Sequence, residues 1–231
     1  QPYLNPAPEP LRGFKTDAAG AGAVIAIAGG KGGVGKTTTT ACLARALATG
    51  DETPIAVDGD CDMPDLHVVA GTAAEPGIDS HTADTPVEAV THSAVELPGV
   101  DVLPAGRGDA DALESTLDAL EDTDRRVLVD TPAGASPVVA TALRSASAVV
   151  VVSTATRESL EDAAKTAEMA RTLGTTPIGT VLTRSDGSVD PVDLLGCPTL
   201  THVPEVASPL TDETVERRYD SVGSLISKRN I

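Results

Sequence analysis

The sequence has no run of 18 apolar residues, although 41% of its residues are hydrophobic. A membrane-spanning helix needs about 20 consecutive apolar residues, so no such helix is expected. Basic residues are also scarce, because 17 Lys and Arg face 34 Asp and Glu, and only five of the 17 are Lys. With a net charge of −17 and no basic cluster longer than two residues, the chain should repel nucleic acids and anionic membranes.

Cysteine and tyrosine are rare as well. Cys42, Cys61 and Cys197 include no CxxC spacing, and an odd number of cysteines without a pairing motif favours a reducing compartment. We therefore expect a cytoplasmic protein whose cysteines are small packing residues. A metal site shared by these cysteines is disfavoured. Kinases that rely on a tyrosine cluster are disfavoured too, because only Tyr3 and Tyr219 are present.

The excess of acidic residues is the most unusual feature of the composition. Acidic and apolar residues alternate in regular periods, which indicates a folded acidic surface rather than disorder. At molar salt, charges are screened over about 3 Å, and the repulsion among them weakens. We therefore expect a halophilic protein, of the kind found in the salt-rich cytoplasm of halophilic archaea.

Two regions differ in character along the chain. Residues 1–22 are rich in Pro, Ala and Gly and are predicted to form an irregular tail. Residues 23–231 are predicted to form one domain in which apolar strands alternate with helices. The predicted strands are 23–28, 54–58, 100–105, 126–130, 148–154, 177–183 and 199–204. The predicted helices are 37–49, 109–121, 136–146, 157–173 and 211–222.

This alternation predicts an α/β fold with a doubly wound, mostly parallel sheet of seven strands and helices on both faces. Several strands are almost continuously apolar, as expected for strands that are covered on both faces. Residues 71–99 show no clear period and are predicted to form a loop with short helices.

A glycine-rich segment, GGKGGVGKT at 29–37, lies between the first predicted strand and the first predicted helix. It matches the phosphate-binding pattern G-x-x-x-x-G-K-[ST]. Its glycines let backbone N–H groups surround phosphate oxygens, and the positive end of the helix favours the same anion. Lys36 is expected to reach the β- and γ-phosphates, and the Thr37 hydroxyl to ligate Mg²⁺. The predicted phosphate-binding residues are Gly30, Lys31, Gly32, Gly33, Val34, Gly35, Lys36, Thr37 and Thr38.

Carboxylates stand at the ends of two predicted strands. Asp58 ends the strand at 54–58 and is followed by Asp60, and Asp130 ends the strand at 126–130. Ligands of open α/β sheets bind at the carboxyl ends of the strands, so these side chains are expected to support Mg²⁺ or to position a water molecule. The next two aspartates, Asp62 and Asp65, fit surface charges as well as they fit a site role.

The pattern K-G-G-x-G-K-T-T at 31–38 resembles the deviant Walker A motif of the MinD/ParA ATPases, and VLVDTPAGA at 127–135 resembles their Walker B segment. The resemblance implies a P-loop ATPase that forms a homodimer on ATP, with Lys31 reaching the phosphates of the partner subunit. Without that role, Lys31 would be a solvated loop lysine. The resemblance also implies that Asp60 orients water, that Asp58 supports the metal shell and that Asp130 is the Walker B carboxylate.

The resemblance extends to the base pocket. Thr183-Arg184 resembles the segment that holds adenine in the family, and Pro204-Glu205 lies in a stretch that resembles its second base-contacting loop. Arg184, Pro204 and Glu205 are therefore predicted to contact the base. Residues 183–186, Thr-Arg-Ser-Asp, also resemble the guanine motif [NT]-K-x-D, so GTP is an alternative to the favoured ATP.

Together these features predict a slow ATPase that binds ATP or ADP with Mg²⁺ and uses Lys31, Lys36 and Asp60 as catalytic residues. It would dimerise on ATP and position or regulate an unidentified protein partner, as MinD-like proteins do. A ParA-like DNA or cargo partition ATPase and a nucleotide-gated binding module with negligible turnover are the alternatives. The C-terminal stretch 219–231 is short and weakly amphipathic, so direct membrane binding is not expected.

Overall fold

The computed structural model describes residues 23–50 and 52–229, and the predicted tail at 1–22 lies outside the described residues. Within the described residues, one eight-stranded sheet has the strand order β3-β4-β2-β5-β1-β6-β7-β8. Its neighbouring strands are all parallel except β3 and β4. The strands are β1 (Val24–Ala28), β2 (Ile55–Asp58), β3 (His92–Ser93), β4 (Asp101–Leu103), β5 (Val127–Asp130), β6 (Ala148–Thr154), β7 (Thr176–Thr183) and β8 (Thr199–Val203).

The predicted α/β class and the mostly parallel, doubly wound sheet are confirmed. All seven predicted strands occur, but the predicted number of strands is wrong, because β3 adds an antiparallel eighth strand beside β4. A strand of two residues is too short to show a hydrophobic period, so the sequence gives no sign of it. The region 71–99 otherwise contains the two short 3₁₀-helices η1 (Ile78–Ser80) and η2 (Val87–Val90).

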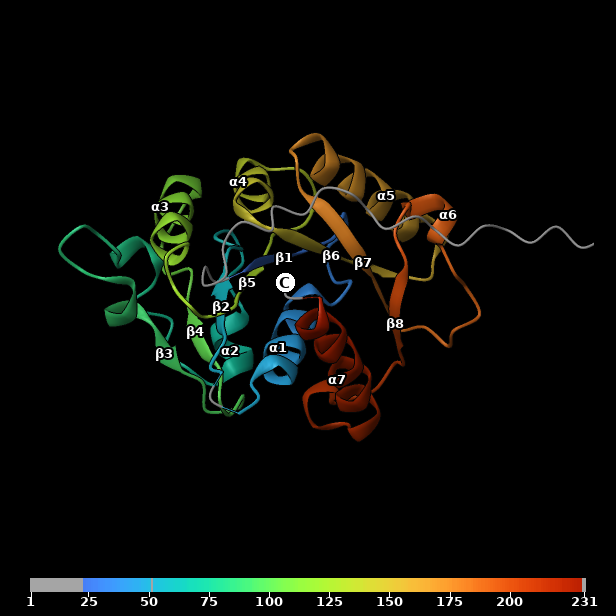
Figure 1. Ribbon diagram of the computed structural model, residues 1–231, viewed down its shortest axis with the longest axis horizontal. Coiled ribbons are helices and arrows are strands. Elements are labelled where there is room, and N and C mark those ends of the chain that lie inside the picture. Colours follow the sequence, from blue (N-terminus) through green and yellow to red (C-terminus); the bar gives the residue numbers. More distant parts are fainter. Residues whose placement is uncertain (1–22, 51, 230–231) are drawn as a thin grey trace, which may run out of the picture.

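Helices cover both faces of the sheet (Figure 1). One face carries α1 (Lys36–Leu47), α2 (Leu66–Ala70) and α7 (Glu213–Lys228), and the other carries α3 (Ala110–Leu120), α4 (Pro137–Ser145), α5 (Arg157–Thr172) and α6 (Val192–Leu195). Alternate residues of β1 serve the two faces. Ile25 and Ile27 pack with α1 and α7, whereas Val24, Ala26 and Ala28 pack on the side of α3, α4 and α5. This double burial explains why the central strands are apolar without interruption.

The last helix, α7, extends six residues beyond the predicted end at 222. It continues through Gly223, where a Cβ would lie 3.0 Å from the carbonyl oxygen of Ala46, so glycine allows α7 to pack closely on α1. The Tyr219 side chain is buried in the same contact. The apolar side of α7 is therefore part of the core, next to η3 (Pro209–Thr211). Among the described helices, none has the length and apolar character that crossing a bilayer requires.

The sheet order brings the carboxyl ends of three strands together. β5 lies between β1 and β2, with Asp130 in register with Ile27 on one side and with Asp58 on the other. The glycine-rich loop leaves β1 at this edge and leads into α1. The residues predicted to bind phosphate and metal therefore meet at the middle of the sheet.

Candidate functional site

The loop between β1 and α1 needs glycine for two separate reasons. A Cβ on Gly29 would lie 2.6 Å from a backbone carbonyl oxygen of β6, and a Cβ on Gly30 would lie 2.5 Å from one of α5. Gly33 and Gly35 have φ angles of +73° and +93°, in the left-handed region that favours glycine. Close packing and backbone conformation thus account for the glycines of this loop.

The start of α1 supplies the positive charge of the site. The helix begins at Lys36, and its N-cap, Gly35, offers no side chain to the first N–H groups. These groups and the helix dipole are therefore available to an anion. Lys36 is only 8% exposed, and Thr37 beside it is half-buried.

Two buried carboxylates lie at this edge of the sheet, and one of them, Asp130, contacts the start of α1. Asp58 and Asp130 are in register at the ends of β2 and β5, and both are almost fully buried. Burial, followed by the charge of Asp130, raises the pKa of Asp58 to about 8. Burial raises the pKa of Asp130 to about 7, although a hydrogen bond from Thr37 and the charge of Lys36 oppose this shift. The Oδ2 atom of Asp130 is buried and has no hydrogen-bond partner among the described residues.

These donors fit a magnesium ion. Paired carboxylate oxygens, one of them unpartnered, are the hard ligands that Mg²⁺ prefers, directly or through water. Within 23–50 and 52–229, no group of three or more His, Cys, Asp or Glu side chains is arranged to hold a metal ion by itself. A cation here would thus need the Thr37 hydroxyl, phosphate oxygens and water to complete its shell.

The loop after β2 is organised by its own aspartates. Asp58 accepts hydrogen bonds from the backbone N–H groups of Asp60 and Leu66, each at 3.1 Å. Asp60 is half-buried, and its Oδ1 accepts from the N–H of Met63 at 3.1 Å. Asp58 therefore shapes the loop that carries Asp60, in addition to facing Asp130. Asp62 and Asp65 are exposed, as expected for surface charges.

The residues predicted to hold the base lie on the loops after β7 and β8. The Arg184 guanidinium donates to the carbonyl oxygen of Gly33 at 2.8 Å, and the Thr183 hydroxyl donates to that of Val34 at 2.6 Å. Pro204 is half-buried and Glu205 is exposed. The structure thus joins the predicted base loop to the phosphate loop through contacts that the sequence did not reveal.

Lys31 stands at the exposed tip of the phosphate loop. Its Nζ lies 2.9 Å from Oε2 of Glu158, in the first turn of α5. Sequence reasoning missed Glu158, because residues 157–173 are predicted only to form a helix, with no role in the site. Nothing near Glu158 in the sequence indicates that its carboxylate meets the phosphate loop.

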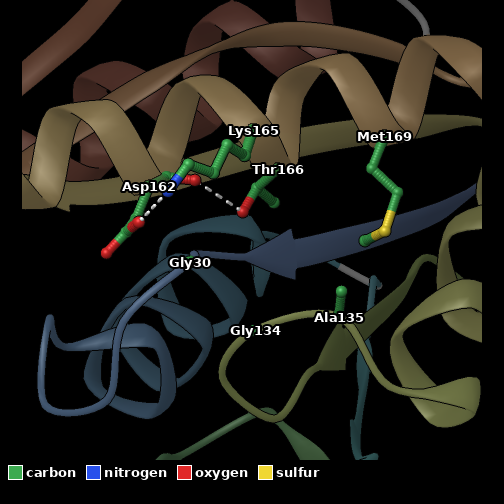
Figure 2. Close-up of a pocket in the computed structure, with 7 residues that line it drawn as sticks. All are labelled: Gly30, Gly134, Ala135, Asp162, Lys165, Thr166 and Met169. Carbon is green, nitrogen blue, oxygen red and sulfur yellow. Dashed lines mark hydrogen bonds and ion pairs between the residues drawn. The ribbon is translucent and has the colours of Figure 1, made fainter.

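A pocket of about 200 Å³ opens beside the phosphate loop, between α5 and the segment that follows β5 (Figure 2). Among the residues that line it, the Lys165 ammonium lies 2.8 Å from Oδ1 of Asp162. The Thr166 hydroxyl donates to the carbonyl oxygen of Asp162 at 3.1 Å. The pocket flanks the predicted phosphate site, because Gly30 of the glycine-rich loop and Gly134 and Ala135 of the predicted Walker B segment line it. Its lining residues are Gly30, Gly134, Ala135, Asp162, Lys165, Thr166 and Met169.

Comparison with known proteins identifies the family. A profile of the CobQ/CobB/MinD/ParA nucleotide binding domain matches residues 25–193. The chain belongs to this family. An ATP-binding protein of Methanocaldococcus jannaschii is 31% identical over 191 residues, which cover 79% of this chain and 72% of that protein.

Solved MinD structures have the same fold. The cell division ATPase MinD of Pyrococcus furiosus gives a TM-score of 0.78 at 26% identity, over 90% of this chain and 99% of that one. MinD of Pyrococcus horikoshii, complexed with Mg-ADP, also gives 0.78, at 24% identity and over 90% and 97% of the two chains. The predicted membership of the MinD/ParA P-loop ATPases is confirmed, and with it the nucleotide-binding character of the family.

Proposed function

We propose that this chain is a dimerising switch that binds Mg·ATP, hydrolyses it slowly and thereby controls its association with a protein partner. The observation that carries the proposal is the meeting of Lys36 and Thr37 with the buried pair Asp58 and Asp130 at one edge of the sheet. The negative charge of a phosphate tail would balance the positive charge of Lys36 and of the helix N-terminus. A divalent cation would balance the negative charge of the two carboxylates.

In this scheme the chain contributes positioning and electrostatics rather than covalent chemistry. The N–H groups of the phosphate loop and of α1 bind phosphate oxygens, and Lys36 neutralises their charge. Magnesium, when bound, neutralises further charge on the phosphates and is supported by Thr37, Asp58 and Asp130. Asp60, whose Oδ1 is already held by the N–H of Met63, orients the attacking water.

The adenine base would lie near the loops after β7 and β8, with Arg184, Pro204 and Glu205 as its contacts. The bond from Arg184 to Gly33 supports this placement, because it brings the base loop against the phosphate loop. ATP is favoured over GTP, since the other motifs match a family whose relatives include ATP-binding proteins and the ATPase MinD.

Phosphate release and nucleotide binding test the first half of the proposal. The wild-type protein with Mg²⁺ should bind ATP more tightly than GTP and release phosphate from it slowly. Lys36→Ala should lose nucleotide binding. Asp60→Ala should bind ATP but turn it over at least about 100-fold more slowly, the usual scale for a residue that handles the attacking water. Failure of the wild-type protein to bind either nucleotide would overturn the proposal.

Light scattering with and without ATP tests the switching half. We expect a dimer of the wild-type protein with Mg·ATP and a monomer with ADP. Lys31→Ala should stay monomeric while still binding ATP. A wild-type protein that binds ATP but remains monomeric would instead support a nucleotide-gated binding module. An Asp60→Ala variant, which should persist in the ATP state, is the form to use for capturing a partner.

A further inference from the structure

Four consecutive threonines follow Lys36 in the first part of α1, and the proposed nucleotide site uses only Thr37 and Thr38. The next two, Thr39 and Thr40, are fully buried. Their hydroxyls have different environments. The Thr39 oxygen lies 2.8 Å from the hydroxyl of Tyr219 on α7, whereas the Thr40 hydroxyl donates to Oδ1 of Asp130 at 3.2 Å. Two adjacent residues of one helix thus connect it to the core helix α7 and to the Walker B carboxylate.

The contact with Thr40 distinguishes the two oxygens of Asp130. Oδ1 accepts the hydroxyl hydrogen bond, while Oδ2 is buried without a partner among the described residues. Without a fixed partner, the carboxylate could rotate about its Cβ–Cγ bond. A donor on Oδ1 favours one orientation and leaves Oδ2 as the oxygen that remains available to a ligand.

The Thr40 hydroxyl has a second acceptor, the carbonyl oxygen of Lys36 one turn earlier, at 3.1 Å. It carries one proton, so the two acceptors compete for it. An ionised Asp130 is the stronger acceptor, because hydrogen bonds to charged groups are stronger than those to neutral carbonyls. Thr37 and Thr40 are also separated by three positions and lie on the same face of α1. One rigid helix therefore carries the proposed metal ligand, Thr37, together with Thr40, and the hydroxyls of both are hydrogen-bonded to Asp130.

We propose that Thr40 is a positioning residue for the metal site, whose hydroxyl holds Oδ1 of Asp130 and so leaves Oδ2 for the magnesium shell. This inference rests on the proposed function, because it assumes that Mg²⁺ binds with the nucleotide. Removing a residue that hydrogen-bonds a metal ligand commonly weakens metal binding by about 10- to 100-fold.

Magnesium-dependent nucleotide binding, measured with a fluorescent ATP analogue, tests the inference. Thr40→Val replaces the hydroxyl with a methyl group of similar size, and Thr40→Ser retains the hydroxyl. Thr39→Val is the matched control, because it removes the neighbouring buried hydroxyl and its bond to Tyr219. Thr40→Val should raise the Mg²⁺ concentration for half-maximal binding by about tenfold or more. Thr40→Ser and Thr39→Val should stay near the wild-type value.

Binding in EDTA separates the metal from the nucleotide. We expect the affinity of all three variants for metal-free nucleotide to remain near that of the wild type, since the phosphate loop is unchanged. Two results would overturn the role of Thr40. One is an equal increase, in Thr39→Val and Thr40→Val, of the Mg²⁺ concentration for half-maximal binding. The other is a Thr40→Val protein whose half-maximal Mg²⁺ concentration equals that of the wild type. If Thr40→Val does not fold, Thr40→Ala provides the same comparison with Thr40→Ser. A wild-type protein that binds no nucleotide with Mg²⁺ would overturn the proposed function itself.

Discussion

The ammonium group of Lys31 lies 2.9 Å from the carboxylate of Glu158 in the same chain. Both side chains are well exposed, at 44% and 74%, so water and salt screen the pair. Exposed ion pairs contribute no more than about 1 kcal/mol to stability. The lysine proposed to act on a partner subunit is therefore held within its own chain by a weak interaction, which a phosphate group could replace.

Lys31→Ala should accordingly leave the fold nearly as stable as the wild type. The free energy of unfolding, measured by chemical denaturation, is expected to fall by less than about 1 kcal/mol. This small cost makes the predicted loss of ATP-dependent dimerisation interpretable, because the variant remains folded. Lys228→Ala removes an exposed lysine at the end of α7 and controls for the change in net charge. A strongly destabilised Lys31→Ala protein would show that Lys31 has a structural role.

Gly30→Ala and Gly32→Ala should differ sharply in stability, although they are two residues apart. A Cβ at Gly30 would lie 2.5 Å from a backbone oxygen of α5, whereas no atom lies within 4 Å of a Cβ at Gly32. Overpacking of this kind costs about 1–3 kcal/mol. Thermal unfolding without nucleotide should therefore show a lower melting temperature for Gly30→Ala alone. Equal melting temperatures would mean that the loop and α5 can separate at little cost.

The nucleotide-free, magnesium-free protein should lose stability as the pH rises from about 4 to about 8. The pKa values of Asp58 and Asp130 are raised from 3.8 to about 8 and about 7, chiefly by burial. The folded state therefore holds two protons that the unfolded chain releases near pH 4. Their contribution to stability is complete below pH 3.8 and is lost as the pH passes through about 7 and 8.

Asp130→Asn tests this explanation, because it removes one of the two titrating groups. Its melting temperature in EDTA should decline less steeply between pH 5 and pH 8, ~3 pH units that span the raised pKa values. Glu114→Gln, which removes an exposed carboxylate from α3, controls for the loss of one negative charge. A slope in Asp130→Asn as steep as that of the wild type would rule out Asp130 as the source.

The acidic surface predicts a dependence on salt. With 34 acidic and 17 basic residues, repulsion among carboxylates should destabilise the folded state at low ionic strength. Raising KCl from about 0.1 M to about 1 M shortens the screening length from about 10 Å to about 3 Å. The melting temperature should therefore rise over this range. Replacing KCl with NaCl separates screening from a specific effect of potassium, and an unchanged melting temperature would argue against halophilic adaptation.

Strands and the phosphate loop could be predicted because their signals are local. Each buried strand is a short apolar run, and the loop concentrates its glycines and Lys36 within nine residues, 29–37. The short elements β3, α2 and α6 were missed, because two to five residues do not establish a period. The end of α7 was also misplaced, since Gly223 serves a close contact with α1 rather than a helix stop.

Contacts between distant parts of the chain could not be predicted in this way. Glu158 meets Lys31, Arg184 meets Gly33, and Thr40 meets Asp130 only because the strand order places their elements side by side. Neither Glu158 nor Thr40 is distinctive within its own segment, and nothing in the sequence pairs Arg184 with Gly33. The sequence therefore indicates which residues could bind phosphate and metal, but the fold is needed to show which neighbours hold them in place.

The burial of Tyr219 has a practical consequence. The chain has no Trp and two Tyr, and Tyr219 is the one within the described residues. Its hydroxyl is bonded to Thr39, two positions after Thr37 on the helix that begins at the phosphate loop. The intrinsic tyrosine fluorescence of the unlabelled protein therefore reports on the buried side of α1. A shift of α1 when nucleotide binds to or leaves the phosphate loop would change this fluorescence.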